Sequence, residues 1–346
     1  MPVFKQILPA ILWFSLVLAT SITFYMSEVP RELLSESVTN SSSILQANNS
    51  AFLNNAAQIA TGSTHTCAIT SSRSLRCWGE NTWGQLGNST TINSSIPAQV
   101  SGLAAGVTSV TVGSYHTCAL TINGGVKCWG NNSGQLGDGT TTSRSTPVNV
   151  IGLNSGVVAV SAGSHHTCAL TSSGGVKCWG VNNSGELGDG TTVEKTVPVD
   201  VIGLSGNVIA ISTGGSFSCA VMNDGTVRCW GSNYHGQIDN GTTTDQYTPT
   251  NLINLAGNVD AISSGAAHSC VLINNGLMCW GSNFSGQLGD GTNAHQTSAV
   301  QVTGMGSGVS SASAGGTHTC SQMNDGSLAC WGKNDHGQLG DGTNIS

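Results

Sequence analysis

The sequence predicts an all-β protein, a β-propeller with four-stranded blades of about 50 residues each. One observation is a period: a cysteine recurs every 50 or 51 residues, at Cys67, Cys118, Cys168, Cys219, Cys270 and Cys320. A second is the phrase Cys-Trp-Gly-Asn-Asn-Ser-Gly-Gln-Leu-Gly-Asp-Gly-Thr at 128–140, which returns in each period with small changes. The third is composition, because 47 of 346 residues are Gly and only 8% are charged, which favours short strands and tight turns. A fixed, strand-rich period of this length is typical of radial repetition.

The chain begins with a segment that resembles a targeting signal. Lys5 precedes a mostly apolar run from Ile7 to Tyr25. Residues 1–26 therefore predict a cleaved signal peptide or an uncleaved signal anchor, and both imply export. Residues 27–54 are rich in Ser and Asn and predict a flexible spacer. The repeats then fill residues 55–346, which we expect to form the propeller domain.

One unit can be divided into four strands. In the second unit we expect strands at 107–112, 115–121, 125–130 and 147–150, with a tight turn at Asn123-Gly124-Gly125. Pro147 would begin the fourth strand, and a missing N–H is tolerated best on an edge strand. Six such units are visible. The sixth stops at Ser346 before a fourth strand, so we expect it to be incomplete.

The repeated motifs resemble those of the regulator of chromosome condensation repeat family. They are Trp-Gly-x-Asn-x-x-Gly-Gln-Leu-Gly, Gly-Asp-Gly-Thr, Pro-x-x-Val and Gly-x-x-His-(Thr/Ser)-Cys, and together they cover about residues 57–346. The resemblance implies a β-propeller that usually has seven blades, against six units here. It also implies a candidate activity, since founding members of the family are guanine nucleotide exchange factors for small GTPases and associate with chromatin.

All 12 cysteines fall into pairs within a unit. The pairs are Cys67 with Cys77, Cys118 with Cys128, Cys168 with Cys178, Cys219 with Cys229, Cys270 with Cys279, and Cys320 with Cys330. A hairpin that turns at Asn123 places the two cysteines of the second unit opposite each other, close to disulfide reach. Together with the leader, this pairing predicts one disulfide in each blade. The alternatives are zinc ligation, which prefers shorter Cys spacings, and twelve reduced thiols in a cytosolic protein. The fifth pair has one residue fewer between its cysteines, so its turn must differ.

Histidines, tryptophans and aspartates also recur, and we interpret them as structural. A His precedes the first Cys by two residues in five units, but Phe217 replaces it in the fourth, which argues against imidazole chemistry. A Trp follows the second Cys in every unit and is expected to pack between blades. Aspartates such as Asp138 lie between glycines, where turn chemistry is more common than calcium binding. We expect no metal, no cofactor and no catalytic centre.

Function should reside where the units differ. Two loops vary between units, one before Gly-Gln-Leu and one before the Pro strand. The candidate binding residues in these loops are Trp83, Arg144, Tyr234, His235, Tyr247, Phe284 and His336. Aromatic residues in exposed loops are common contact residues, although packing on the next blade is an equal alternative.

The sequence therefore favours a non-enzymatic, exported scaffold that binds a protein or a glycan through its rim loops. Its place would be secreted, periplasmic or on the cell surface. The formal net charge of −7 disfavours nucleic acid, and a membrane is expected only if the leader is an uncleaved anchor. The alternative is an exchange-factor-like regulator of a small GTPase.

Overall fold

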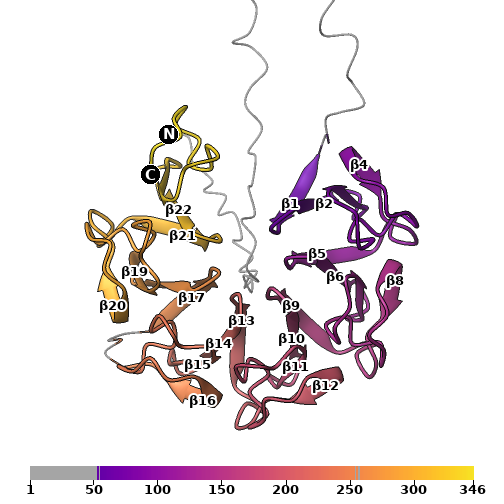
Figure 1. Cartoon of the computed structure of the whole chain (residues 1–346), viewed down its shortest axis with the longest axis horizontal. Helices are drawn as coiled ribbons and strands as arrows, with labels where there is room; N and C mark the ends of the chain where they lie inside the picture. Colours follow the sequence, from indigo (N-terminus) through magenta and orange to yellow (C-terminus); the bar gives the residue numbers. More distant parts are fainter. Residues whose placement is uncertain (1–52, 54, 254, 256–257) are drawn as a thin grey trace, which may run out of the picture.

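A computed structural model describes residues 53, 55–253, 255 and 258–346. The expected leader at 1–26 and, apart from Leu53, the expected spacer at 27–54 lie outside this part. Every regular element in the described residues is a β-strand. The strands form six sheets that stand as blades in an arc around a common axis, with the first and last blades at its two ends (Figure 1).

The first two blades contain β1 (Ala56–Thr61), β2 (His65–Thr70), β3 (Leu75–Gly79), β4 (Ser94–Gln99), β5 (Val107–Val112), β6 (His116–Thr121), β7 (Val126–Gly130) and β8 (Arg144–Asn149). The next two contain β9 (Val157–Ala162), β10 (His166–Thr171), β11 (Val176–Gly180), β12 (Lys195–Asp200), β13 (Val208–Thr213), β14 (Phe217–Met222), β15 (Val227–Gly231) and β16 (Gln246–Asn251). The last two contain β17 (Val259–Ser264), β18 (His268–Ile273), β19 (Gly276–Gly281), β20 (Gln296–Gln301), β21 (Val309–Ala314), β22 (His318–Met323) and β23 (Leu328–Gly332).

Each blade is an antiparallel meander whose first strand lies nearest the axis (Figure 1). Five blades have four strands, and the sixth, β21-β22-β23, has three. The predicted six-unit propeller with an incomplete last unit is thus confirmed for the described residues.

The fourth strand differs from the expectation at its start. In the second blade it begins at Arg144, so Pro147 lies inside the strand rather than at its first residue. The strand pairs only with β7, and the register shifts between the pairs Cys128–Val148 and Gly130–Arg144. Because this strand is at the sheet edge and bulged near Pro147, the missing N–H removes no ladder hydrogen bond.

The hairpin between the second and third strands places the two cysteines of each unit directly opposite one another. Cys118, for example, is the register partner of Cys128. All six predicted pairs form disulfides with Cα–Cα distances of 4.1 Å: Cys67 with Cys77, Cys118 with Cys128, Cys168 with Cys178, Cys219 with Cys229, Cys270 with Cys279, and Cys320 with Cys330. The described residues contain no free cysteine, so the zinc and free-thiol alternatives do not apply to this structure.

The disulfides lie inside the blades and away from solvent. Ten of the bridged cysteines are buried, and only Cys320 and Cys330 of the three-stranded last blade are half-buried. The shorter fifth pair has the different turn that its spacing required. Asn274 and Asn275 both adopt positive φ, 51° and 62°, as a two-residue hairpin turn demands. The cysteines therefore have a structural role in every unit.

The core lies between blades, where the recurring Trp of each blade after the first packs against the preceding blade. Trp129, Trp179, Trp230 and Trp280 are almost fully buried. The indole Nε1 of Trp129 donates to the backbone carbonyl of Gln85 in the preceding blade at 2.9 Å, and the same bond recurs at all five joints between described blades. The predicted packing role is therefore confirmed for the five tryptophans at these joints.

The recurring histidines lie at the same joints. His65 Nε2 lies 2.8 Å from the hydroxyl of Thr117 in the next blade, and that hydroxyl donates to the Gln85 carbonyl at 2.9 Å. The hydroxyl therefore accepts from the imidazole, which places the imidazole proton on Nε2. His116, His166 and His268 make equivalent contacts. Burial lowers the pKa of His65 to about 4 and that of the other three to about 3, so all four are neutral at physiological pH.

Candidate functional site

The candidate site is built on the loops that follow the third strand of each blade, which we call the loop rim. Its six loops span 80–93, 131–143, 181–194, 232–245, 282–295 and 333–346. A shared hydrogen-bonding framework holds each loop. In the second blade the Asn132 side chain donates to Asp138, to the Thr140 carbonyl and to the Thr142 carbonyl at 3.0–3.2 Å. Asp138 in turn accepts from the backbone and hydroxyl of Thr140, which confirms the turn role predicted for the Gly-Asp-Gly aspartates.

The backbone at the tip of each loop is anchored by the side chain two residues further along the chain. The Gln85 side chain accepts from the backbone N–H of Trp83, and Gln237 accepts from that of His235, both at 2.9 Å. Because the bond uses only the backbone of the tip residue, the tip side chain is free to vary without altering the loop. The framework is therefore constant, while the residues that it presents differ from blade to blade.

The predicted rim residues are placed at these tips with large exposed surfaces. Tyr234 is 76% exposed, Phe284 is 71% exposed and Trp83 is 45% exposed. The His336 side chain is also exposed and lies beside Asp335. These four residues are therefore accessible to a partner.

Two other predicted residues contribute to structure. Arg144 forms an ion pair with Asp138, with a contact of 2.8 Å, and also donates to Thr140, so it closes its own loop. Tyr247 lies on β16 and packs over Gly185 of the third blade, where an added Cβ would come within 2.5 Å of its ring. Both side chains thus have structural contacts, and Tyr247 shows the packing on a neighbouring blade that the sequence left open.

Four rings from two adjacent blades meet at the rim, and we call them the aromatic cluster: Tyr234, His235, Phe284 and His295. His235 contacts three partners edge-on, with ring centroids 4.9 Å from Tyr234, 5.6 Å from Phe284 and 4.8 Å from His295. Phe284 and His295 are closer still, at 4.1 Å. His295 lies in the variable loop before the fourth strand and was not among the predicted binding residues. Its role becomes visible when the two variable loops converge in space.

The two imidazoles of the aromatic cluster are held differently. His295 Nδ1 accepts the backbone N–H of Asn283 at 2.9 Å, which places its ring proton on Nε2. Burial, followed by the proximity of His295, lowers the pKa of His235 below its ordinary value of 6.5. His235 is therefore neutral at physiological pH, and the aromatic cluster carries no positive charge on this ring.

The joint beneath the aromatic cluster, between the fourth and fifth blades, departs from the repeat at three positions. Phe217 occupies the histidine position of the fourth unit and is fully buried. Asp239 stands where the other units have Gly87, Gly137, Gly188, Gly289 and Gly340, and it keeps the positive φ of those glycines at 53°. Ala299 stands where the first four blades have Pro97, Pro147, Pro198 and Pro249.

The departures at Asp239 and Ala299 are coupled across the joint. The Ala299 N–H donates to Asp239 Oδ1 at 3.2 Å, a bond that a proline at this position could not make. Asp239 is fully buried, and its Oδ2 has no hydrogen-bond partner among the described residues. Burial raises the pKa of this carboxyl to about 7. A comparison of the units could have found the pair, since Asp239 alone replaces the recurring Gly and Ala299 alone replaces the recurring Pro.

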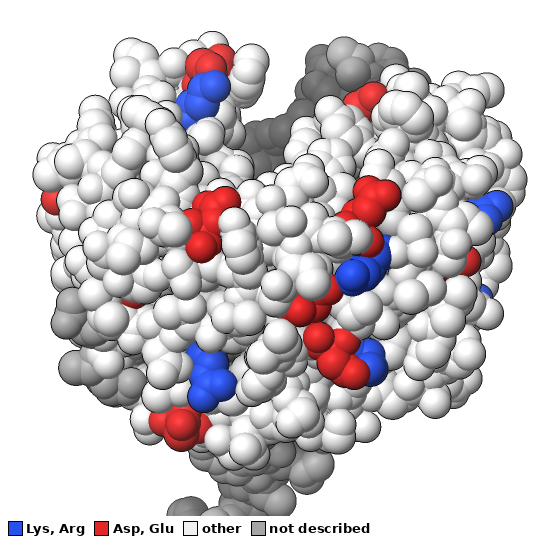
Figure 2. Space-filling view, turned by 60° about the horizontal axis from the view of Figure 1, so that its bottom comes forward, with Lys and Arg blue, Asp and Glu red and all other residues white. Residues whose placement is uncertain are grey.

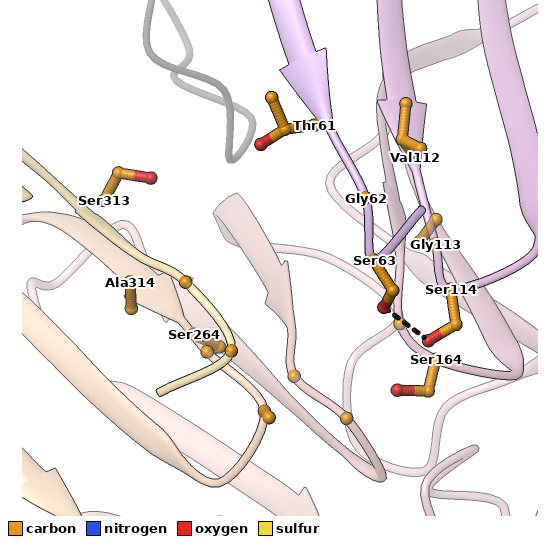
Figure 3. Close-up of a pocket in the computed structure, with 18 of the residues that line it drawn as sticks. Thr61, Gly62, Ser63, Val112, Gly113, Ser114, Ser164, Ser264, Ser313 and Ala314 are labelled. Carbon is orange, nitrogen blue, oxygen red and sulfur yellow. Dashed lines mark hydrogen bonds between the residues drawn. The ribbon is translucent and has the colours of Figure 1, made fainter. Parts of the chain in front are cut away.

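A second concave feature lies on the axis. A cavity of about 620 Å³ is lined by the first strands of all six blades and the loops that follow them. Most of its wall residues are small and uncharged, such as Gly62, Ser63 and Ser114, and the hydroxyls of Ser63 and Ser114 are 3.2 Å apart (Figure 3). Asp, Glu, Lys and Arg are absent from the described lining, and burial lowers the pKa of its one histidine, His318. The cavity therefore offers hydrogen-bonding hydroxyls and no charged group at neutral pH.

Nowhere in the described residues do three His, Cys, Asp or Glu side chains gather closely enough to hold a metal ion. Across the face shown in Figure 2, charged residues lie in small groups on a mostly uncharged surface. No helix that could span a bilayer occurs within the described ranges.

Comparison with known proteins places these features in context. Two models of the Regulator of chromosome condensation (RCC1) repeat match. One covers residues 76–120, 123–170, 173–221 and 224–272, and the other matches six segments between 56 and 338. The chain is 32% identical over 227 residues to the mitochondrial RCC1 domain-containing protein RUG3 of Arabidopsis thaliana, covering 63% of this chain and 40% of that protein.

Human E3 ubiquitin-protein ligase HERC2 is also 32% identical, over 218 residues that are 61% of this chain and 4% of that protein. The chain thus spans less than half of either relative. The crystal structure of human WBSCR16 superposes with a TM-score of 0.76 at 26% identity, over 86% of this chain and 81% of that one.

Proposed function

We propose that this chain, which belongs to the Regulator of chromosome condensation (RCC1) repeat family, is an exported, non-enzymatic propeller scaffold that binds a protein or glycan through its loop rim. The observation that carries the proposal is the contrast within each loop. The Asn and Gln positions that hold the loop are nearly constant. The residues between them vary, from Ser133 alone in the second loop to Thr82-Trp83, Tyr234-His235 and Phe284-Ser285 in the first, fourth and fifth loops. In a repeat protein, such variation on a constant frame is typical of a binding surface.

Export is supported by the six disulfides, since one bridge per blade is typical of an oxidising compartment.

The described lining of the axial cavity favours a scaffold over an enzyme. Acid–base chemistry requires a titratable group poised near the working pH, and the one such group there, His318, has its pKa lowered by burial.

The test compares two sets of substitutions at opposite ends of the blades. Ligands of the wild-type protein are first selected from a glycan array and a displayed peptide library. The triple variant Trp83→Ala, Tyr234→Ala, Phe284→Ala should then lose the selected ligands at an unchanged melting temperature. The control is Ile122→Ala with Leu328→Ala, two exposed residues at the hairpin end of the blades, and it should retain them. Retention of the ligands by the triple variant would exclude the rim.

The alternative, an exchange-factor-like role, rests on the family membership. Its test is the release rate of fluorescent GDP from a purified small GTPase with and without this protein. GDP release that accelerates in proportion to the concentration of this protein would replace the scaffold proposal. An unchanged release rate would exclude an exchange-factor role on this GTPase.

A further inference from the structure

The aromatic cluster has the composition of a site for a positively charged side chain. Tyr234 and Phe284 present most of their rings to solvent, and the faces of aromatic rings attract cations. Edge-on contacts with His235 and His295 hold the two exposed rings in place, because each ring rests against an imidazole at 4.1–5.6 Å. A rigid aromatic surface loses little side-chain entropy when it binds.

In the two loops that carry the aromatic cluster, the charged side chains are all acidic. No Lys or Arg occurs from Ser232 to Gln246 or from Ser282 to Gln296, whereas both loops carry carboxylates. The Asp245 carboxylate accepts the backbone N–H of Asn233, the residue directly before Tyr234, at 2.8 Å. The Asp290 carboxylate accepts from the side chain of Asn283, the residue directly before Phe284, at 3.1 Å. Each of these loops thus contains a carboxylate that is hydrogen-bonded to the residue directly before its exposed ring.

The second and third loops of the rim differ in this respect. Asp138 is neutralised by Arg144 at 2.8 Å, and Asp189 faces Lys195 at 3.5 Å. At Asp290 the equivalent position holds Gln296, which donates a neutral hydrogen bond at 3.0 Å. The fifth loop therefore retains the negative charge that the second and third loops cancel internally. This uncancelled charge belongs to the same loop as the exposed ring of Phe284.

We propose that the aromatic cluster, together with Asp245 and Asp290 of the same two loops, is a docking site for an Arg- or Lys-bearing segment of a partner protein. The guanidinium or ammonium group lies over the faces of Phe284 and Tyr234, and the two carboxylates complement its charge. The inference rests on the proposed function and specifies which part of the rim acts and which partner chemistry it takes. A neutral glycan would stack on the same rings without needing the carboxylates.

The experiment uses the full chain with its disulfides intact and a labelled, end-capped peptide, Gly-Arg-Gly-Arg-Gly. The matched probe replaces arginine with citrulline, which has nearly the same shape but no charge. We expect the arginine peptide to bind at least about tenfold more tightly in fluorescence anisotropy, with an affinity that falls as salt is added. Equal affinity for the two peptides, or no binding of the arginine peptide, would overturn the proposal.

Three variants separate the contributions. Phe284→Leu and Tyr234→Leu keep an apolar side chain but remove the ring face, and each should weaken arginine-peptide binding about two- to fivefold. Asp245→Asn removes a charge while retaining a loop cap, because Asn93 accepts the equivalent Asn81 N–H at 2.8 Å in the first blade. It should weaken binding at low salt, and Ile122→Ala should leave it unchanged.

The outcomes also distinguish this inference from the proposed function. If both leucine variants retain wild-type affinity for the arginine peptide, the docking site is refuted. If the rim triple variant still loses a selected glycan while the arginine peptide fails to bind, the rim proposal stands and the cationic partner is excluded. If neither ligand depends on rim residues, both proposals fall together.

Discussion

Replacing Asp239 with Asn or Gly should stabilise the protein strongly at neutral and alkaline pH and only weakly at acid pH. The carboxyl has an ordinary pKa of 3.8, and burial raises it to about 7 in the folded protein. A raised carboxyl pKa means that the folded state favours the neutral form. Wild-type stability is therefore fully present below pH 3.8, and it is lost progressively as pH rises from 3.8 through about 7.

The size of the effect follows from the gap between the two pKa values, at about 1.4 kcal/mol for each pH unit. The upper limit is about 4 kcal/mol above pH 8. For a chain of this length that corresponds to a difference in melting temperature of about 6 °C. Asp239→Asn removes the titration and keeps the size of the side chain. Asp239→Gly also relieves the positive φ of 53°, which glycine adopts without strain.

The assay is the melting temperature of wild type and both variants, measured from pH 4 to pH 9 under identical salt. The difference between Asp239→Asn and wild type should grow between about pH 4 and pH 7 and remain flat above pH 8. A difference that is independent of pH would refute the reasoning, because the carboxyl would then not change its charge in the folded protein.

A second substitution tests the coupling across the joint. Ala299→Pro removes the N–H that Asp239 accepts, so it should destabilise the wild type by about 1–3 kcal/mol. In the Asp239→Gly background the same change recreates the Gly and Pro pair of the other joints and should be nearly neutral. Additive effects in this double-mutant cycle would contradict a direct interaction.

Three further expectations concern the scaffold and the aromatic cluster. The pKa values of the four buried joint histidines lie at about 3–4, below the 6.5 that applies when they are exposed, so their contribution to stability is present above pH 6.5 and is lost as pH falls toward 4. Unfolding near pH 5 should take up about four protons through these groups, measurable by calorimetry in buffers of different ionisation enthalpy, and His116→Phe should lower the uptake by about one. Mass spectrometry after alkylation should find no free thiol before reduction and 12 after it, and twelve free thiols at the outset would contradict the pairing and the proposed compartment. Arginine-peptide binding should weaken well below pH 6.5, because His235 then gains a positive charge that repels the arginine. An affinity that is constant from pH 7 to pH 4 would exclude His235 from the site.

The sequence by itself determined the repeating parts of this protein. Fixed spacing predicted six blades, the position of each hairpin and the pairing of every cysteine, because a residue opposite another across a two-stranded turn is set by local geometry alone. The different turn between Cys270 and Cys279 followed from the residue missing there. The positions of the loop tips were also predictable, since their variation stands out against a constant frame.

Only the tertiary structure decided which variable residues act together. Tyr234 and Phe284 lie 50 residues apart, and their convergence with His235 and His295 depends on how adjacent blades pack. The same holds for Asp239 and Ala299, whose hydrogen bond joins residues 60 positions apart. Contacts between blades depend on the rotation from one unit to the next, and a repeat pattern in one dimension does not encode that rotation. Burial and charge at such joints, and hence the pKa values of the groups there, are properties of the assembled blades.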